Sequence, residues 1–352
     1  MKNTVGNSTC KPTNMPVHLT GIFMTLSVSG MLTSALGNSL IFLAVYKARS
    51  LRTPANYLLM SLSFASLLFI PVLASYAVSL TKTKCDALIP TLCQWTSLVD
   101  FALFCVVMAH LAVISLDRLL AIKSMRYQDL VTKNRTKALI IFIWIIGTLE
   151  AVFPNILQVL IDSRRGTTLL ELFRGCIQNN RIPGKKTVAM VVPHFLFLMS
   201  LAVFVPSGIM LVTHAWIFKI STEQNRRIRA VQDAMGLRRL SEIRAAKTVA
   251  IIVFSALACF TPLLVVKFII TFEPPLGKRL DPSIFNVKYI LFPSLKILTL
   301  LAICVNPLIY ALKSRPFKEV FKRIFQNVRI SFSKGNDFEP KTRKLGDACT
   351  PN

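Results

Sequence analysis

Apolar residues are gathered in seven long stretches of the chain, and polar residues fill the shorter segments between them. Each stretch holds at least about 20 mainly apolar residues, the length that an α-helix needs to cross the hydrocarbon core of a bilayer. The pattern predicts an all-α membrane protein, a bundle of seven transmembrane helices. The expected spans are residues 19–46, 55–80, 91–119, 137–160, 187–219, 246–272 and 286–312.

The rest of the chain divides around this membrane domain. We expect an extracellular N-terminal tail over 1–18, the transmembrane domain over 19–312, a short amphipathic helix over 313–326 and a disordered cytoplasmic tail over 327–352. The amphipathic segment repeats apolar residues at the spacing of one helix face and carries basic residues on its other faces. The apolar residues are Phe317, Val320, Phe321, Ile324 and Phe325, and the basic ones are Lys318, Lys322 and Arg323.

Lysine and arginine residues gather after the first, third, fifth and seventh stretches. Short loops rich in these residues lie on the cytoplasmic side of a membrane. The sequence therefore predicts a multi-pass plasma-membrane protein with an extracellular N-terminus. The loop residues are Lys47, Arg49 and Arg52 after the first stretch, Lys123, Arg126, Lys133, Arg135 and Lys137 after the third, and Arg226, Arg227, Arg229, Arg238 and Arg239 after the fifth.

Composition agrees with a membrane location. Of the 352 residues, 53% are hydrophobic and 16% are charged, so a soluble fold would leave extensive apolar surface in water. The net charge of +26 is also typical of nucleic-acid-binding proteins. Basic blocks beside apolar spans are explained more simply by topology and anionic lipid head groups, so we expect no nucleic-acid partner.

Four cysteines fall on the predicted outer side, where the oxidising environment allows disulfides to persist. Four cysteines allow three pairings. We expect Cys93, at the start of the third span, to bond Cys176 in the following outer loop, and Cys10 to Cys85 is a second candidate. Asn7 begins an Asn-Ser-Thr sequence in the outer tail, so it is a candidate glycosylation site.

Two motifs stand at the cytoplasmic ends of the third and seventh spans. The third ends in Asp117-Arg118-Leu119, and the seventh contains Asn306-Pro307-Leu308-Ile309-Tyr310. Together they resemble the signatures of rhodopsin-like (class A) G-protein-coupled receptors, and the resemblance runs from about residue 19 to residue 325. Further matching landmarks are Gly37-Asn38, Asn56-Tyr57-Leu58-Leu59, Trp144, Pro206 and Pro262.

The resemblance implies a conformational switch at the cytoplasmic face. An arginine near the inner edge of a bilayer needs a partner, and ionisable residues in spans are functional candidates. By resemblance, Arg118 contacts Asp117 and Glu242 in the inactive state, and an agonist lets the sixth helix move outward. Arg118 then meets a heterotrimeric G protein, and arrestin is a further expected partner. Asn306, Pro307, Tyr310 and His214 are expected to rearrange in the same transition.

The ligand pocket is expected at the outer ends of the helices. Asp100 lies 18 residues before Arg118, about 27 Å along one helix. In this family an Asp at this place commonly binds an ammonium group, which suggests an amine ligand. Lys296 and Lys267 lie near the same level, and either ammonium could neutralise Asp100 internally.

Other pocket positions do not favour a simple amine. The fifth span offers apolar residues, including Met199, where related amine receptors present hydroxyls, and Leu263 and Leu264 replace an aromatic pair beyond Phe260 in the sixth. An amine, a peptide or a small acidic ligand therefore all remain open.

Several family positions are changed. Ser66 replaces an Asp that holds sodium in relatives, Ala302 replaces an Asn, and Val107 nearby is apolar. We therefore expect no metal site and no cofactor. Phe260 replaces a switch Trp, and His214 replaces a Tyr that supports the active state, so weak or constitutive signalling is an alternative.

Other classes of protein fit less well. An intramembrane enzyme needs a nucleophile with a base or clustered metal ligands, and the four histidines form no such motif. A transporter commonly shows inverted repeats or a pair of broken helices, and neither is visible. A receptor that binds ligand without signalling stays open within the same fold.

Overall fold

The computed structural model describes residues 17–81, 88–124, 126–162, 200–228, 234–272 and 290–336. Within them it confirms the predicted seven-helix architecture, because seven helices are long and apolar enough to cross a membrane. They are α1 (Val17–Lys47), α2 (Pro54–Thr81), α3 (Leu88–Lys123), α5 (Lys133–Asp162), α8 (Val205–Ile228), α9 (Ala234–Phe272) and α11 (Phe292–Lys313).

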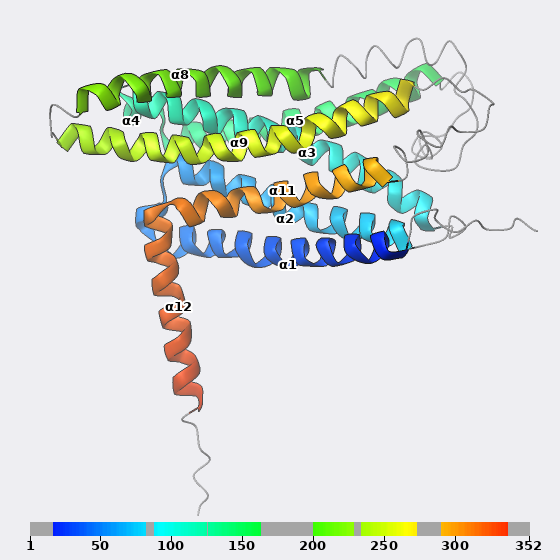
Figure 1. Cartoon of the computed structure of the whole chain (residues 1–352), viewed down its shortest axis with the longest axis horizontal. Helices are drawn as coiled ribbons and strands as arrows, with labels where there is room; N and C mark the ends of the chain where they lie inside the picture. Colours follow the sequence, from blue (N-terminus) through cyan, green and yellow to red (C-terminus); the bar gives the residue numbers. More distant parts are fainter. Residues whose placement is uncertain are drawn as a thin grey trace, which may run out of the picture.

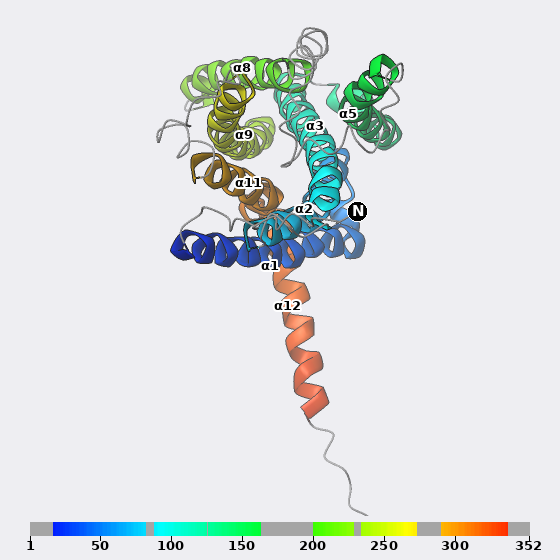
Figure 2. The same ribbon diagram turned by 90° about the vertical axis from the view of Figure 1, so that its right-hand side faces the viewer.

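The long helices run side by side as one bundle (Figure 1). Helices α1, α2, α3, α8, α9 and α11 are neighbours in a closed ring, and α5 packs on the outside of α3 (Figure 2). The core inside the ring is apolar and includes Phe69 of α2, Met108 of α3 and Phe260 of α9. The fold thus places the third helix against most of the others.

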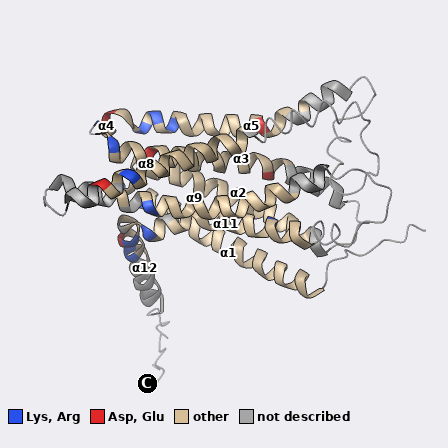
Figure 3. Cartoon of the chain, turned by 45° about the horizontal axis from the view of Figure 1, so that its top comes forward, with Lys and Arg blue, Asp and Glu red and all other residues tan. Residues whose placement is uncertain are grey.

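Large apolar side chains also cover the outside of the bundle. Phe142 of α5, Phe218 of α8 and Phe254 of α9 are each more than half exposed. Apolar surface on this scale marks a membrane-contacting face rather than a water-facing one. Lys and Arg gather at one end of the bundle, the end from which α12 leaves (Figure 3).

Helices α3 and α5 approach each other closely at Gly147. A Cβ atom there would lie 3.0 Å from the backbone nitrogen of Val106 and 2.6 Å from its Cγ2. Only glycine permits this spacing, which is typical of close helix contacts in membranes. The contact sets the register between α5 and the outer half of α3.

Several helices extend past their predicted ends. Helix α9 begins at Ala234, well before the expected start at 246, because the intervening residues are polar but contain no proline. The predicted start of the fifth span, 187–199, lies outside the described residues. Before α8, residues Ser200–Phe204 form a π-helical segment, η4, which ends two residues before Pro206.

The amphipathic segment forms α12 (Arg315–Asn336), longer than the expected 313–326. The sequence keeps apolar residues at the same helical spacing at Val328 and Phe332, so the pattern does not end at 326. Helix α12 runs across the bundle axis rather than along it (Figure 1). Its residues Phe317, Phe321 and Ile324 are buried against α1 and the last turn of α11, while Phe325 is exposed.

Candidate functional site

The outer end of the bundle holds a charged pair between α3 and α11. The Nζ of Lys296 donates a hydrogen bond to Oδ2 of Asp100, and the two side chains are only 18% and 19% exposed. Of the two ammonium groups considered for Asp100, the structure therefore pairs it with Lys296. This pair joins the third and seventh spans at the end of the bundle opposite Arg118.

Aromatic and apolar side chains lie next to this pair. Phe104 of α3 packs edge-on against Phe260 of α9, with ring centroids 4.8 Å apart, and it stacks on Phe101 at 6.4 Å. Phe260 and Leu263 are buried, and Leu264 is partly buried against Cys105, Ala202 and Val203. The predicted pocket residues Phe260, Leu263 and Leu264 thus belong to the packed region between α3, η4 and α9.

Some predicted residues fall outside what the structure describes. They are Asn7, Cys176, Met199, and the side chains of Cys93, Glu242, Lys267 and Tyr310. The expected disulfide, the glycosylation site and the contact between Arg118 and Glu242 therefore remain predictions.

The inner end of α3 holds a second charged group. Arg118 and Asp117 are 7% and 5% exposed, and the Arg118 Nε donates to Asp117 Oδ2 at 3.0 Å. Tyr127, in the short helix α4 (Tyr127–Leu130), donates its hydroxyl to Asp117 Oδ1 at 2.6 Å. The carboxylate thus binds both the arginine and the loop after α3. Sequence reasoning missed Tyr127, because a one-turn helix carries no periodic signal.

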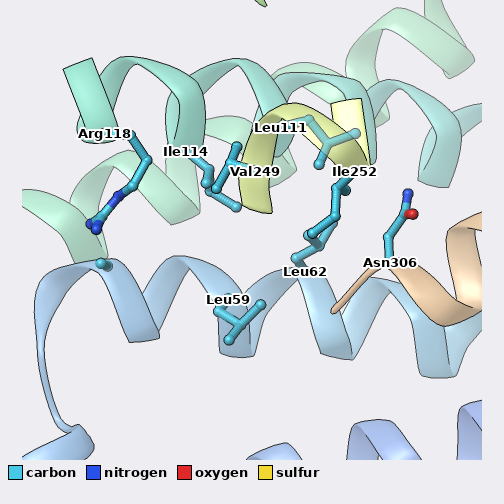
Figure 4. Close-up of a pocket in the computed structure, with 9 residues that line it drawn as sticks. Leu59, Leu62, Leu111, Ile114, Arg118, Val249, Ile252 and Asn306 are labelled. Carbon is cyan, nitrogen blue, oxygen red and sulfur yellow. The ribbon is translucent and has the colours of Figure 1, made fainter. Parts of the chain in front are cut away.

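A small cavity of about 20 Å³ lies beside Arg118, between α2, α3, α9 and α11. Arg118 stands at one end and Asn306 at the other, with apolar side chains between them (Figure 4). The Asn306 side chain is 2% exposed, and its Nδ2 has no hydrogen-bond partner among the described residues. Pro307 follows within α11 and removes a helix hydrogen bond at this level. A cavity large enough for about one water molecule thus lies between the two predicted motifs, beside an amide nitrogen without a partner among the described residues.

His214 of α8 faces α3 in the same half of the bundle. The Ser115 hydroxyl donates to the carbonyl of Leu111 at 2.8 Å, so His214 Nε2, 3.3 Å from that hydroxyl, donates to it. His214 Nδ1 then has no partner among the described residues, although the side chain is 5% exposed. Only one ring nitrogen of His214, Nε2, therefore has a hydrogen-bond partner among the described residues.

Sequence reasoning also missed a polar cluster that joins α2, α3 and α5. His110 Nδ1 lies 2.8 Å from the Val106 carbonyl, which can only accept, so Nδ1 carries the proton. The Ser61 hydroxyl then donates to His110 Nε2 at 2.9 Å and accepts from Trp144 Nε1 at 3.0 Å. Each polar hydrogen of the three side chains has an acceptor, so this cluster fixes helix positions.

The comparisons with known proteins agree with this architecture. The family described as "7 transmembrane receptor (rhodopsin family)" matches residues 37–310. The chain belongs to this family, the rhodopsin-like (class A) G-protein-coupled receptors, and it is a multi-pass membrane receptor rather than an enzyme.

Individual receptors that resemble this chain share only about a quarter of its residues. The adenosine receptor A2b of Rattus norvegicus is 28% identical over 300 residues, covering 82% of this chain and 85% of the relative. The trace amine-associated receptor 1 of Mus musculus is 25% identical over 301 residues, covering 84% and 85%. The adenosine receptor A2a of Homo sapiens is 26% identical over 326 residues, covering 89% and 74%. The class is therefore shown, and the ligand is not.

The sodium site that the family implies does not fit these residues. Asn38 donates to Ser34 Oγ at 3.0 Å and to the Cys304 carbonyl at 3.1 Å, while the Ser34 hydroxyl donates to the Ser66 carbonyl at 3.1 Å. The Ser66 hydroxyl reaches the carbonyls of Leu62 and Ile303, each at 3.1 Å. Neutral hydrogen bonds thus join α1, α2 and α11 where a carboxylate would be needed to hold the cation.

Proposed function

We propose that this receptor binds an extracellular ligand between the outer halves of α3, α9 and α11 and activates a heterotrimeric G protein at the opposite end. One observation carries the proposal: α3 holds a partly buried ion pair to α11 at its outer end and a buried arginine–carboxylate pair at its inner end. Charged groups inside a membrane protein are expensive and mark functional sites.

The Asp100–Lys296 pair supports a ligand that carries charge. An ammonium group of the ligand would compete with Lys296 for Asp100, and an acidic group would compete with Asp100 for Lys296. Either exchange would change the contact between α3 and α11, which is what a ligand must do to shift a two-state equilibrium. Trace amine and adenosine receptors among the relatives favour a small amine or nucleoside-like molecule. A peptide or a small acid that carries such groups fits the same pair.

The packing at the Arg118 end of the bundle supports coupling to a G protein through movement of α9. Ile243 and Ala246 of α9 pack on Ile122 of α3 and Ile217 of α8 in a small apolar cluster. Separation of this cluster would let α9 swing outward and expose Arg118 to the C-terminal helix of the G protein. An arrestin would use the same face.

The proposal includes a topology. Basic residues gathered at the α12 end support a cytoplasmic location for that end and an extracellular N-terminus. The Cys93–Cys176 disulfide and glycosylation at Asn7 belong to this orientation. Residues 1–18 form the outer tail, 19–312 the receptor domain, and α12 with the following residues the cytoplasmic end.

The test uses purified receptor in lipid nanodiscs and purified G proteins of the stimulatory, inhibitory and phospholipase-coupled types. Nucleotide exchange is measured with and without the receptor, first alone and then with amines, peptides and small acids. We expect exchange by at least one G protein to rise, and Arg118→Ala to abolish the rise at the same concentration of folded receptor. Lys133→Ala, an exposed basic residue at the same end, is the matched control.

Coupling that persists in Arg118→Ala would refute the switch. Asp100→Asn tests the pocket separately. A ligand response that this variant leaves unchanged would show that the ligand does not contact Asp100.

A further inference from the structure

The Asp100–Lys296 pair restricts the net charge of a ligand that binds to it. The pair is neutral as a unit, and its side chains are only 19% and 18% exposed. A singly charged cation must displace Lys296 or share the carboxylate with it, and either way one positive charge is left over. A singly charged anion leaves one negative charge over in the same way. An uncompensated charge in a largely desolvated site is costly, so both kinds of ligand lose affinity.

A ligand that carries both charges leaves the site neutral. The bond between the two side chains joins one N–H of Lys296 to Oδ2 of Asp100. An ammonium has three N–H donors and a carboxylate has two acceptor oxygens, so each group can bind its partner and a ligand at the same time. The ligand's ammonium can therefore bind Asp100, and its carboxylate can bind Lys296, while α3 and α11 remain joined.

The separation of the two ligand charges is also restricted. Asp100 and Lys296 lie within hydrogen-bonding distance of each other, so the two charges that match them must be close together. In an α-amino acid one carbon joins the two charged groups, and the nitrogen lies about 2.5 Å from the carboxyl carbon. Laid beside the pair in the opposite sense, an α-amino acid completes a ring of four alternating charges. In a peptide, at least one peptide bond separates the terminal charges, and such a ring does not close.

An aromatic surface lies next to the pair on the side toward Arg118. Phe104 follows Asp100 by four residues, so the two side chains share one face of α3. Its ring stacks on Phe101 and packs edge-on against Phe260 of α9, which is 1% exposed. A large apolar or aromatic ligand side chain is complementary to this surface. The surface also connects the ion pair to α9, the helix that moves in the proposed coupling.

We propose that the ligand is an α-amino acid with a large apolar or aromatic side chain. Its ammonium binds Asp100, its carboxylate binds Lys296, and its side chain packs on Phe104. The inference rests on the proposed function, which places the ligand between the outer halves of α3, α9 and α11, and it narrows the chemical class of that ligand.

The test removes one ligand charge at a time. Purified full-length receptor in nanodiscs is titrated with L-phenylalanine, with phenylethylamine, which lacks the carboxylate, and with phenylpropionate, which lacks the ammonium. L-Leucine, isoamylamine and isocaproate form a second series. Affinity is taken from the concentration dependence of the melting temperature. We expect at least one amino acid to stabilise the parent, and its amine and acid counterparts to bind at least about 30-fold more weakly.

Two variants should reverse this preference. Asp100→Asn and Lys296→Met should each weaken the amino acid about 30-fold or more. In Asp100→Asn the remaining charge is positive, so the acid should now bind more tightly than the amine. In Lys296→Met the remaining charge is negative, so the amine should bind more tightly than the acid. A purely structural role for the pair would not produce this exchange of preference.

A matched control and melting temperatures without ligand test whether the variants are folded. Glu223→Gln removes an exposed acidic group of α8 and should bind all six compounds as the parent does. Phe104→Ala should weaken the amino acid without changing the order of amino acid, amine and acid.

The inference is overturned if neither amino acid stabilises the parent, if an amine or an acid binds as tightly as its amino acid, or if the two variants lose affinity without exchanging preference. Failure of the proposed function looks different. In that case the amino acid binds with the expected pattern, but no G protein exchanges nucleotide.

Discussion

Removing either member of the Asp100–Lys296 pair should destabilise the receptor more than removing both. At an effective dielectric constant near 20, two unit charges about 4 Å apart attract by about 4 kcal/mol. Both side chains are less than a fifth exposed, so solvent screens the pair only modestly. Asp100→Asn or Lys296→Met leaves one buried charge without its partner, which costs about 3–5 kcal/mol. The double variant leaves neither charge and should cost clearly less.

Thermal unfolding in nanodiscs without ligand measures this cycle. At about 2 °C per kcal/mol for a chain of this size, each single variant should melt about 6–10 °C below the parent. The double variant should melt above both single variants, which requires a coupling energy larger than the cost of either single change, about 3–5 kcal/mol. Additive losses, with the double variant below both singles, would refute the view that the two charges stabilise each other.

Three further changes test the packing. Gly147→Ala should lower the free energy of unfolding by about 1–3 kcal/mol, because α3 and α5 must separate to admit the methyl group. Gly208→Ala places its methyl group in open space and should not lower the melting temperature. Asn38→Ala should lower the free energy of unfolding by about 1–3 kcal/mol, because it removes hydrogen bonds to α1 and α11. Replacing sodium by choline in the buffer should leave the melting temperature of the parent unchanged, because neutral hydrogen bonds occupy the position of the family's sodium site. Phe317→Ala should cost about 3–5 kcal/mol and raise hydrogen exchange in α12, while Phe325→Ala, already exposed, should do neither.

The seven-helix fold could be predicted because a bilayer imposes a length and a polarity that few soluble sequences share. Helix ends were harder to place. Helix α9 starts at Ala234 in a polar segment that has no membrane signal but also nothing to break a helix. The start of α8 follows a π-helical segment that no periodicity indicates.

In the candidate site, too, some features could be predicted from sequence and others depend on the tertiary structure. Asp100 and Arg118 stand out because charges are rare in spans, so each could be singled out from sequence. Which lysine meets Asp100 depends on how α11 is rotated, and that is a tertiary property.

Helix α12 also fixes where the receptor stands relative to the lipid. Because it leaves the bundle sideways and is held to α1 by Phe317 and Phe321, its apolar side can meet the head-group layer of one leaflet at only one height along the bundle. A change in bilayer thickness then moves the other membrane surface relative to the bundle. In a thicker bilayer, the Asp100 end would be drawn into hydrocarbon while the Arg118 end kept its distance from the membrane surface. Affinity for a ligand at the proposed Asp100 site should therefore vary with acyl chain length more than affinity for the proposed G-protein contact does.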